Sequence, residues 1–285
     1  MSARDVFKLL RVPHYVKNIL IFIPLFFSGG VDKIDSVLTA LCGFVAFSLF
    51  ASSIYIINDI KDLSKDRRHP TKKHRPIASG RVSVRQALTI GVITFLLGVL
   101  CSLVINASPA SYLTVALYIA INIMYSYGLK NIPIVDVAIL AAGFVLRVAY
   151  GAFIIDTYVS SWLLLTILSM ALYMGLGKRR NEIIGNGTKT RTVNKFYARD
   201  FLDKNMYMFS TMSIVFYSLW TVSPTVPSET VATVPLVIIV MMIYSLNIED
   251  QSSDGDPTNV LLKSRYLALS VLIYLLAVLF IFYVR

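Results

Sequence analysis

The sequence predicts an all-α integral membrane protein, a polytopic bundle of about nine transmembrane helices. Of its 285 residues, 56% are apolar or aromatic and only 15% are charged, and the mean hydropathy is +0.69. Soluble domains carry about 25% charged residues. Nine spans of roughly 20 residues would use about 180 residues and leave about 100 for loops and ends. Residues 1–285 are therefore expected to form one membrane-embedded domain, with no separate soluble domain.

Nine apolar runs mark the positions of these spans. They cover residues 16–30, 36–58, 84–106, 109–128, 133–155, 160–177, 206–226, 230–248 and 266–284. Runs of this length and composition are typical of membrane-spanning helices. The Gly and Pro residues within them are tolerated, because neighbouring helices satisfy the backbone groups that such residues leave open.

The basic residues fall almost entirely on one side of this topology. With the N-terminus inside, 24 of the 27 Lys and Arg residues face the cytoplasm, whereas Lys33 and Arg285 lie opposite and Arg147 lies within a span. Such asymmetry is the positive-inside signal of multi-pass proteins. It predicts an inner (plasma) membrane protein with cytoplasmic loops at 59–85 and 178–205. The membrane also explains the net charge of +11, so that no nucleic-acid partner is expected.

The N-terminal segment is basic and amphipathic. Arg4, Lys8 and Arg11 form one charged stripe on a predicted short helix over residues 3–12. A helix of this kind typically lies in the membrane interface as an anchor. The alternative is that residues 1–30 are a secretory signal peptide, because a basic start precedes a short apolar core and small residues.

The second span ends in a dense acidic motif, N-D-I-K-D-L-S-K-D at residues 58–66. On an α-helix, Asp59, Asp62 and Asp66 would share a face only about 60° wide. Their carboxylates would repel one another and oppose the helix dipole, so a cation should offset them. Carboxylate oxygens in this arrangement suit Mg²⁺, which binds one or two carboxylates together with substrate phosphates. The alternative is a solvated helix end whose aspartates pair with nearby basic residues.

A cationic loop follows directly, with the sequence RRHPTKKHRPIASG at residues 67–80. Its Lys72 and Arg75 are candidates for binding the phosphates of a soluble ligand beside the acidic motif. The positive-inside rule alone accounts for many of these charges.

Several polar residues stand at membrane depth or at span ends. Arg147 and Asp136 are 11 residues apart in the fifth span, which returns to nearly the same helix face, so we expect both to line one cavity. Tyr125 belongs to a polar stripe near the end of the fourth span, and Lys130 follows it. Interhelical hydrogen bonding and substrate contact are equally compatible with that stripe. Lys17 opens the first span, where it could simply extend to the interface.

The sixth span ends in three consecutive cations, Lys178-Arg179-Arg180, followed by Asn181 and Glu182. They form a candidate phosphate clamp, and the positive-inside rule is again the alternative explanation. The segment Asp254-Gly255-Asp256-Pro257-Thr258, after the eighth span, has the composition of a surface turn. Its acidic residues could also cover the site.

Together these motifs resemble the UbiA-type intramembrane prenyltransferase superfamily, and within it the polyprenyl-phosphate phosphoribosyltransferase branch. The resemblance covers essentially the whole chain. The residues that carry it are Lys17-Asn18, the 58–66 motif, His69-Pro70, Lys72, Arg75-Pro76-Ile77-Ala78-Ser79-Gly80, Gly177-Lys178-Arg179 and Gly255-Asp256-Pro257-Thr258. The superfamily's usual second aspartate-rich motif, after the sixth span, is replaced here by residues 178–182. The branch commonly has an acidic residue where this chain has Asn259.

The resemblance implies helices arranged around a central cavity that opens to the cytoplasm. It implies transfer of the 5-phosphoribosyl group of phosphoribosyl diphosphate to a polyprenyl phosphate, such as decaprenyl phosphate, with release of diphosphate. The products of this reaction are lipid-linked pentose donors for cell-wall polysaccharides. Because the acceptor phosphate is already anionic at neutral pH, this reaction hardly needs a general base. A homo-oligomer in the bilayer is compatible with this interpretation.

The resemblance also suggests roles for the candidate residues. Asp59, Asp62 and Asp66 would hold Mg²⁺ on the diphosphate leaving group. Arg75, Lys72 and Lys130 would bind donor phosphates, and Lys178, Arg179 and Lys17 would meet the lipid phosphate. The remaining candidate substrate contacts are Asn58, Tyr125 and Arg147.

Two other functions remain as alternatives. With the same fold, the aspartates could bind a prenyl diphosphate whose prenyl group is moved to an aromatic acceptor. An ion-coupled transporter of phosphorylated metabolites could use Asp136 and Arg147 within the membrane, although transport predicts more ionisable groups near the midplane.

Overall fold

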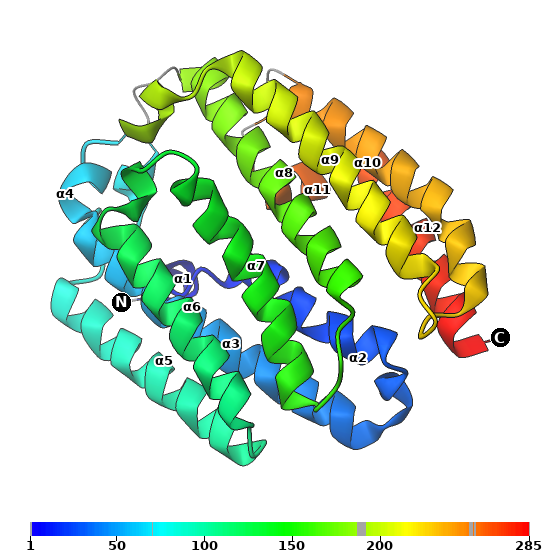
Figure 1. The fold of residues 1–285 in the computed structure, drawn as a ribbon. Coiled ribbons are helices and arrows are strands. Elements are labelled where there is room, and N and C mark those ends of the chain that lie inside the picture. Colours follow the sequence, from blue (N-terminus) through cyan, green and yellow to red (C-terminus); the bar gives the residue numbers. More distant parts are fainter. Residues whose placement is uncertain (1, 70, 187–191, 251–252, 254, 285) are drawn as a thin grey trace. The chain divides into compact units, whose positions relative to one another are not determined.

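The computed structural model describes residues 2–69, 71–186, 192–250, 253 and 255–284. Within these residues, every regular element is a helix (Figure 1). Pro70, Lys189, Arg191 and Asp254, which belong to the predicted motif and loops, lie outside the described residues. The chain divides into two compact units. Unit 1 comprises Met1–Gly128 and Leu146–Tyr158, and unit 2 comprises Leu129–Val145 and Val159–Arg285.

Unit 1 is built around one long central helix, α3. Its elements in chain order are α1 (Ala3–Leu9), η1 (Val12–Phe22), α2 (Ile23–Phe27), η2 (Gly30–Asp32), α3 (Ile34–Lys61), α4 (Leu63–Asp66), η3 (Lys72–His74), α5 (Val84–Val104), α6 (Pro109–Tyr127) and the second part of α7 (Val135–Ile154). α3 packs against η1, α5 and α6. Phe47, Phe50, Tyr118 and Tyr150 lie in its buried core, and burial of such aromatic side chains is a large stabilising contribution.

The first predicted span, residues 16–30, is an irregular segment instead of one α-helix. η1 is a 3₁₀ helix, and the segment Val12–Phe27, which comprises η1 and α2, is bent by 49° relative to α1. Tyr15 and Asn18 of η1 form hydrogen bonds of 2.8 Å with the hydroxyls of Ser52 and Ser48 on α3. Ile21, one further step of three residues, is fully buried. A β-carbon at Gly151 of α7 would lie only 2.1 Å from the carbonyl oxygen of Ile21, so η1 and α7 pack backbone against backbone there.

Unit 2 contains the remaining long helices. Its elements are the first part of α7, η4 (Leu129–Asn131), α8 (Ser161–Asn186), η6 (Thr192–Phe196), α9 (Arg199–Thr221), η7 (Ser228–Thr233), α10 (Val234–Glu249), α11 (Pro257–Lys263), α12 (Arg265–Leu279) and the π-helical turn Phe280–Val284. α8 lies along α9, and α10 contacts both α9 and α12 (Figure 1). Segment 178–205, expected as a loop, includes the end of α8, all of η6 and the start of α9.

Seven of the described helices are long and apolar enough to cross a membrane, or eight if α1 and the bent segment Val12–Phe27 form one broken span. The prediction of nine spans is therefore not confirmed. Apart from the broken N-terminal segment, the missing span is residues 206–226, most of which belong to α9 (Arg199–Thr221). This helix is 23 residues long, but charged residues fill its first turns and hydroxyl groups interrupt the rest. The seven helices still indicate a multi-pass membrane protein.

Candidate active site

Asp59 and Asp66 converge on one arginine in unit 1. Arg75 Nη1 lies 3.0 Å from Asp59 Oδ1 and 2.6 Å from Asp66 Oδ2. Arg11 Nη2 lies 2.5 Å from the same Asp59 oxygen. Both carboxylates are nearly buried, whereas the side chain of Arg75 remains 29% exposed. The cations that offset the repulsion between the aspartates are thus two arginines from outside α3.

Asp59 and Asp66 share a partner, whereas Asp62 lies where α3 ends and α4 begins. α3 ends at Lys61, and Asp62 is the junction residue between α3 and α4. The backbone N–H of Asp62 donates to Asn58 O at 2.9 Å and that of Asp66 donates to Asp62 O at 2.8 Å, so hydrogen bonds between residues four apart are present on both sides of the junction. Asp62 is only partly buried. Among the described residues, no three His, Cys, Asp or Glu side chains come together as a ready-made metal site.

The loop after the motif is folded so that Arg75 reaches the aspartates. Ile77 and Val82 are buried against Leu9 and Ile56. Turn hydrogen bonds join Ser79 N to Arg75 O at 2.9 Å and Val82 N to Pro76 O at 3.0 Å. Apolar anchoring on both sides of the turn therefore fixes a charged side chain over an acidic pair.

His69 stands between the motif and this loop. Its Nδ1 accepts a hydrogen bond of 3.3 Å from the backbone N–H of Thr71. Burial, and then the nearby positive charge of Lys72, lower the pKa of His69 below its usual value. The lowered pKa favours the neutral imidazole, which accepts a hydrogen bond here and shapes the loop.

Four further predicted residues, Asn58, Lys17, Lys72 and Tyr125, also lie in unit 1. Asn58 accepts a hydrogen bond from the hydroxyl of Ser126 on α6. Three candidates are partly exposed, namely Lys17 in η1, Lys72 in η3 and Tyr125 in α6.

Arg147, predicted to line a cavity, is enclosed by protein groups. Its side chain donates to Asn18 Oδ1 at 2.7 Å and to the Tyr118 hydroxyl at 3.0 Å, and its guanidinium lies 5.4 Å from the ring centre of Phe47. The residue is only 5% exposed. In the structure it therefore connects α7 with η1, α3 and α6, because Asn18, Phe47 and Tyr118 belong to those three elements.

Asp136 takes different partners, in unit 2. Its Oδ2 lies 3.1 Å from Arg179 Nε, and its Oδ1 accepts a 2.6 Å hydrogen bond from Tyr197. Arg179 also pairs with Glu182, one turn further along α8. Asp136 and Arg179 are both completely buried. Asp136 and Arg147 therefore belong to two separate networks, each within its own unit.

Burial changes the interpretation of the three cations at residues 178–180. Arg179 is enclosed with two carboxylates and Arg180 pairs with Asp203, so neither presents a free phosphate-binding group in this structure. Lys178 is partly exposed and pairs with Asp256 at 2.6 Å. Gly255 adopts φ +68°, and a β-carbon there would lie 2.8 Å from Lys178 Cα. The glycine is thus what allows the 255–256 turn to approach α8 closely. Lys130, in η4 of unit 2, is partly exposed.

Two features of these clusters were not anticipated from the sequence. Arg11, interpreted as a surface anchor, is a direct partner of Asp59. The pairing of Asp136 with Arg179 was also missed, although an acidic residue in an apolar span generally requires a cationic partner. Neither partner is recognisable by local spacing.

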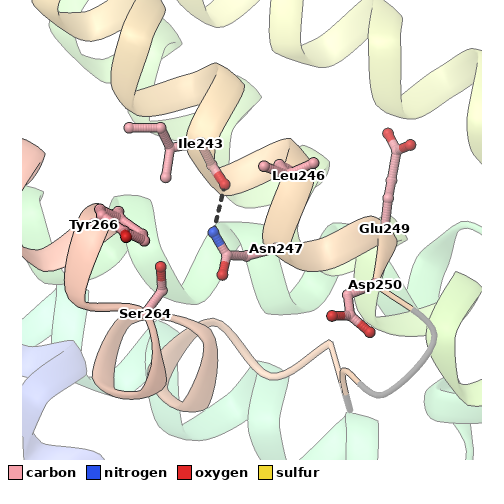
Figure 2. A pocket seen from close by; sticks show the side chains of 7 residues that line it. All are labelled: Ile243, Leu246, Asn247, Glu249, Asp250, Ser264 and Tyr266. Atoms are coloured by element: carbon pink, nitrogen blue, oxygen red, sulfur yellow. Dashed lines mark hydrogen bonds between the residues drawn. The ribbon is translucent and has the colours of Figure 1, made fainter.

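A separate pocket of about 640 Å³ lies in unit 2 between the end of α10 and the start of α12 (Figure 2). Its lining residues are Ile243, Leu246, Asn247, Glu249, Asp250, Ser264 and Tyr266. Asn247 uses its amide to bond Ile243 O at 2.7 Å, within its own helix. The sequence predicted none of these residues as part of a site.

Comparison with known proteins relates the chain to membrane transferases. It is 30% identical to the decaprenyl-phosphate phosphoribosyltransferase of Corynebacterium glutamicum, over 99% of this chain and 88% of that protein. It is 31% identical to the enzyme of the same name from Mycolicibacterium smegmatis, over 94% of this chain and 89% of that protein.

Comparison of the fold with solved structures also identifies related proteins. A solved structure of a UbiA homolog from Archaeoglobus fulgidus, bound to DMAPP and Mg²⁺, superposes with a TM-score of 0.74 at 17% identity, over 98% of this chain and 99% of that one. A model of the UbiA prenyltransferase family matches residues 19–256, which is most of the chain. This chain therefore belongs to the UbiA prenyltransferase family.

Proposed function

We propose that this protein transfers the 5-phosphoribosyl group of phosphoribosyl diphosphate to the phosphate of a polyprenyl phosphate. The observation that carries the proposal is the near full-length similarity to two decaprenyl-phosphate phosphoribosyltransferases. The paired carboxylates of Asp59 and Asp66 support it, because a diphosphate donor needs a cationic and metal-binding environment.

The acidic pair fits Mg²⁺. Asp59 and Asp66 each contact Arg75 Nη1, so their oxygens face a common point, and two carboxylates leave coordination positions for water and phosphate oxygens. Asp59, Asp66 and the neighbouring Asp62 are the residues that would hold the ion. When bound, Mg²⁺ would stabilise the diphosphate leaving group.

The chain's own residues then have distinct tasks. Arg75 and Lys72 would bind donor phosphates, because a guanidinium and an ammonium group next to the acidic pair match the charge of a diphosphate. The acceptor phosphate oxygen attacks C1 of the ribose, the bond from C1 to the diphosphate breaks, and diphosphate leaves with the bonding electrons. No side chain needs to remove a proton, since a phosphate monoester is already ionised at pH 7.

Three further parts of the proposal concern individual residues and topology. Asn58, Lys17, Tyr125, Lys130 and Lys178 remain candidate substrate contacts. The burial of Arg147 and Arg179 favours supporting roles for both instead of direct phosphate binding. The asymmetry of basic residues supports a protein of the inner membrane with the N-terminus and Asp59 on the cytoplasmic side.

The test is a comparison of two substrate pairs with purified protein. One mixture contains labelled phosphoribosyl diphosphate and polyprenyl phosphate, and the other contains labelled prenyl diphosphate and an aromatic hydroxyacid. We expect lipid-linked phosphoribose in the first mixture only, and its formation should stop with EDTA and return with added Mg²⁺. Prenylation in the second mixture alone would replace this function with ordinary prenyl transfer.

A further inference from the structure

A pocket of about 480 Å³ opens beside α1 in unit 1, next to the acidic pair. It is lined by Arg4, Phe7, Lys8, Arg11, Pro13 and His14. Four of these six residues carry cationic or imidazole groups, and the other two offer apolar surface. Phe7 is 49% exposed, so its ring presents apolar surface at the pocket.

The pocket is built on a segment that is firmly attached. Ser2 and Asp5 cap α1 in a reciprocal capping box. Asp5 also pairs with Arg81 at 2.9 Å, and Leu10 O accepts a 2.8 Å hydrogen bond from Ser52 of α3. Leu9 is fully buried. These contacts hold the charged stripe in a fixed position relative to α3, as a binding site requires.

Arg11 links the pocket to the reaction centre. It adopts the left-handed conformation, with φ 53° and ψ 44°, which is uncommon for a residue with a side chain. Its guanidinium lies 4.8 Å from the ring centre of Tyr55 and binds Asp59. Backbone strain of this kind tends to persist where the surrounding structure and function constrain the residue. One side chain thus belongs both to the pocket and to the acidic pair.

The charge of the pocket is unbalanced. Arg11 is paired with Asp59, but among the described residues neither Arg4 nor Lys8 makes an ion pair, and both are exposed. Asp5, on the same helix, is bonded to Arg81 instead. Two cations beside apolar surface complement a ligand that has an anionic head and a hydrocarbon tail.

From these observations we infer that the Arg4–Lys8–Arg11 pocket binds the phosphate group of the lipid acceptor, with Phe7 and Pro13 against the first part of its tail. The inference rests on the proposed function for the identity of the acceptor. It places the attacking phosphate next to Arg11, which touches Asp59 directly. Arg4 and Lys8 are then binding residues for a polyprenyl phosphate, beyond the interfacial anchoring that their spacing suggests.

The test compares Arg4→Ala/Lys8→Ala with wild type in a neutral detergent that contains no anionic phospholipid. We expect the KM for polyprenyl phosphate to rise about tenfold or more, because two charge-assisted contacts are lost, with the KM for phosphoribosyl diphosphate unchanged. Arg4→Lys/Lys8→Arg should restore it. Arg85→Ala, which removes an exposed cation from the start of α5, is the matched control and should leave both KM values unchanged.

A binding measurement separates this inference from the proposed function. Polyprenyl phosphate should raise the thermal unfolding temperature of wild type more than polyprenol or inorganic phosphate does, and Arg4→Ala/Lys8→Ala should lose that shift. This readout holds even if wild type transfers no phosphoribose. An unchanged KM and shift in the double variant would overturn the inference. A defect confined to vesicles with anionic phospholipid would also overturn it, in favour of simple adsorption to the bilayer.

Discussion

Two clusters of acidic and basic side chains, one in each unit, differ in their access to solvent. In unit 1, Asp59 and Asp66 share Arg75, whose side chain is 29% exposed. In unit 2, Asp136 and Arg179 are both fully buried. A buried ion pair is isolated from charged ligands, whereas a partly exposed guanidinium can exchange a carboxylate for a phosphate at little desolvation cost. The first cluster is therefore suited to chemistry and the second to holding helices together.

The largest expected effect is on activity and concerns the cluster in unit 1. Asp59→Asn should lower kcat by about 10²–10³-fold, because it removes a charge that stabilises the leaving group through the bound cation. Asp35→Asn, at the opposite end of the same helix, is the control and should retain wild-type turnover. Steady-state kinetics at limiting Mg²⁺ measures both. Full turnover by Asp59→Asn would remove the acidic pair from the site.

The second largest expected effect is on the stability of the protein and concerns the buried pair Asp136 and Arg179 in unit 2. Arg179→Met leaves Asp136 as an uncompensated buried charge, so the free energy of unfolding should fall by about 3 kcal/mol. The double variant Asp136→Leu/Arg179→Met should recover part of that loss, because the buried charge of Asp136 is removed while Glu182 still lacks its arginine partner. Thermal unfolding in detergent provides the measurement.

The variant Arg75→Met tests the same comparison from the cluster in unit 1. It should reduce turnover strongly while changing the unfolding temperature less than Arg179→Met does, because Arg75 is partly in contact with solvent. If the two variants exchanged these phenotypes, the assignment of one cluster to chemistry and the other to structure would be reversed.

Two glycines provide a smaller, matched comparison between the units. Gly80 and Gly255 both have positive φ, but an added β-carbon meets nothing within 4 Å at Gly80 and lies 2.8 Å from Lys178 Cα at Gly255. Gly80→Ala should therefore cost about 1 kcal/mol of stability from backbone strain alone. Gly255→Ala should cost more and should also weaken the pair between Lys178 and Asp256. Equal effects on unfolding temperature would show that the close approach to α8 does not matter.

The smallest expected effect is on the pH dependence of folding stability, to which His69 contributes. Because burial and Lys72 lower its pKa in the folded state, the unfolded chain takes up a proton first as the solution is acidified. The contribution of His69 to stability is therefore complete above its unfolded pKa of about 6.5 and decreases as the pH falls below that value. An NMR titration of the imidazole should give a midpoint below 6.5, and His69→Asn should reduce the pH dependence of unfolding. A midpoint above 6.5 would contradict the neutral acceptor role.

The parts of the molecule that were predictable from sequence are those with a local signal. Apolar runs located the long helices, and the i, i+3 and i+7 spacing brought Asp59 and Asp66 to the same side of the chain. Arg75 was identified because it follows the motif closely. The junction at Asp62 was not predictable, because uniform helical spacing assumes that α3 continues.

The contacts that were not predicted join residues far apart in the sequence. Arg11 and Asp59 are separated by 48 positions, and Arg179 and Asp136 lie on different helices. In both cases sequence alone shows a cation in a basic segment, for which membrane topology is a sufficient explanation. Only the folded chain distinguishes the cation that faces a carboxylate from the cation that faces solvent.

Because η1 is a 3₁₀ helix, its sensitivity to substitution should vary with a period of three residues. With three residues per turn, Tyr15, Asn18 and Ile21 stack directly above one another, whereas an α-helix would rotate each successive member by about 60°. Substitutions along Val12–Phe22 should therefore be harmful at every third position. Analysis of the sequence for α-helical periodicity, which assumes 3.6 residues per turn, does not detect this pattern.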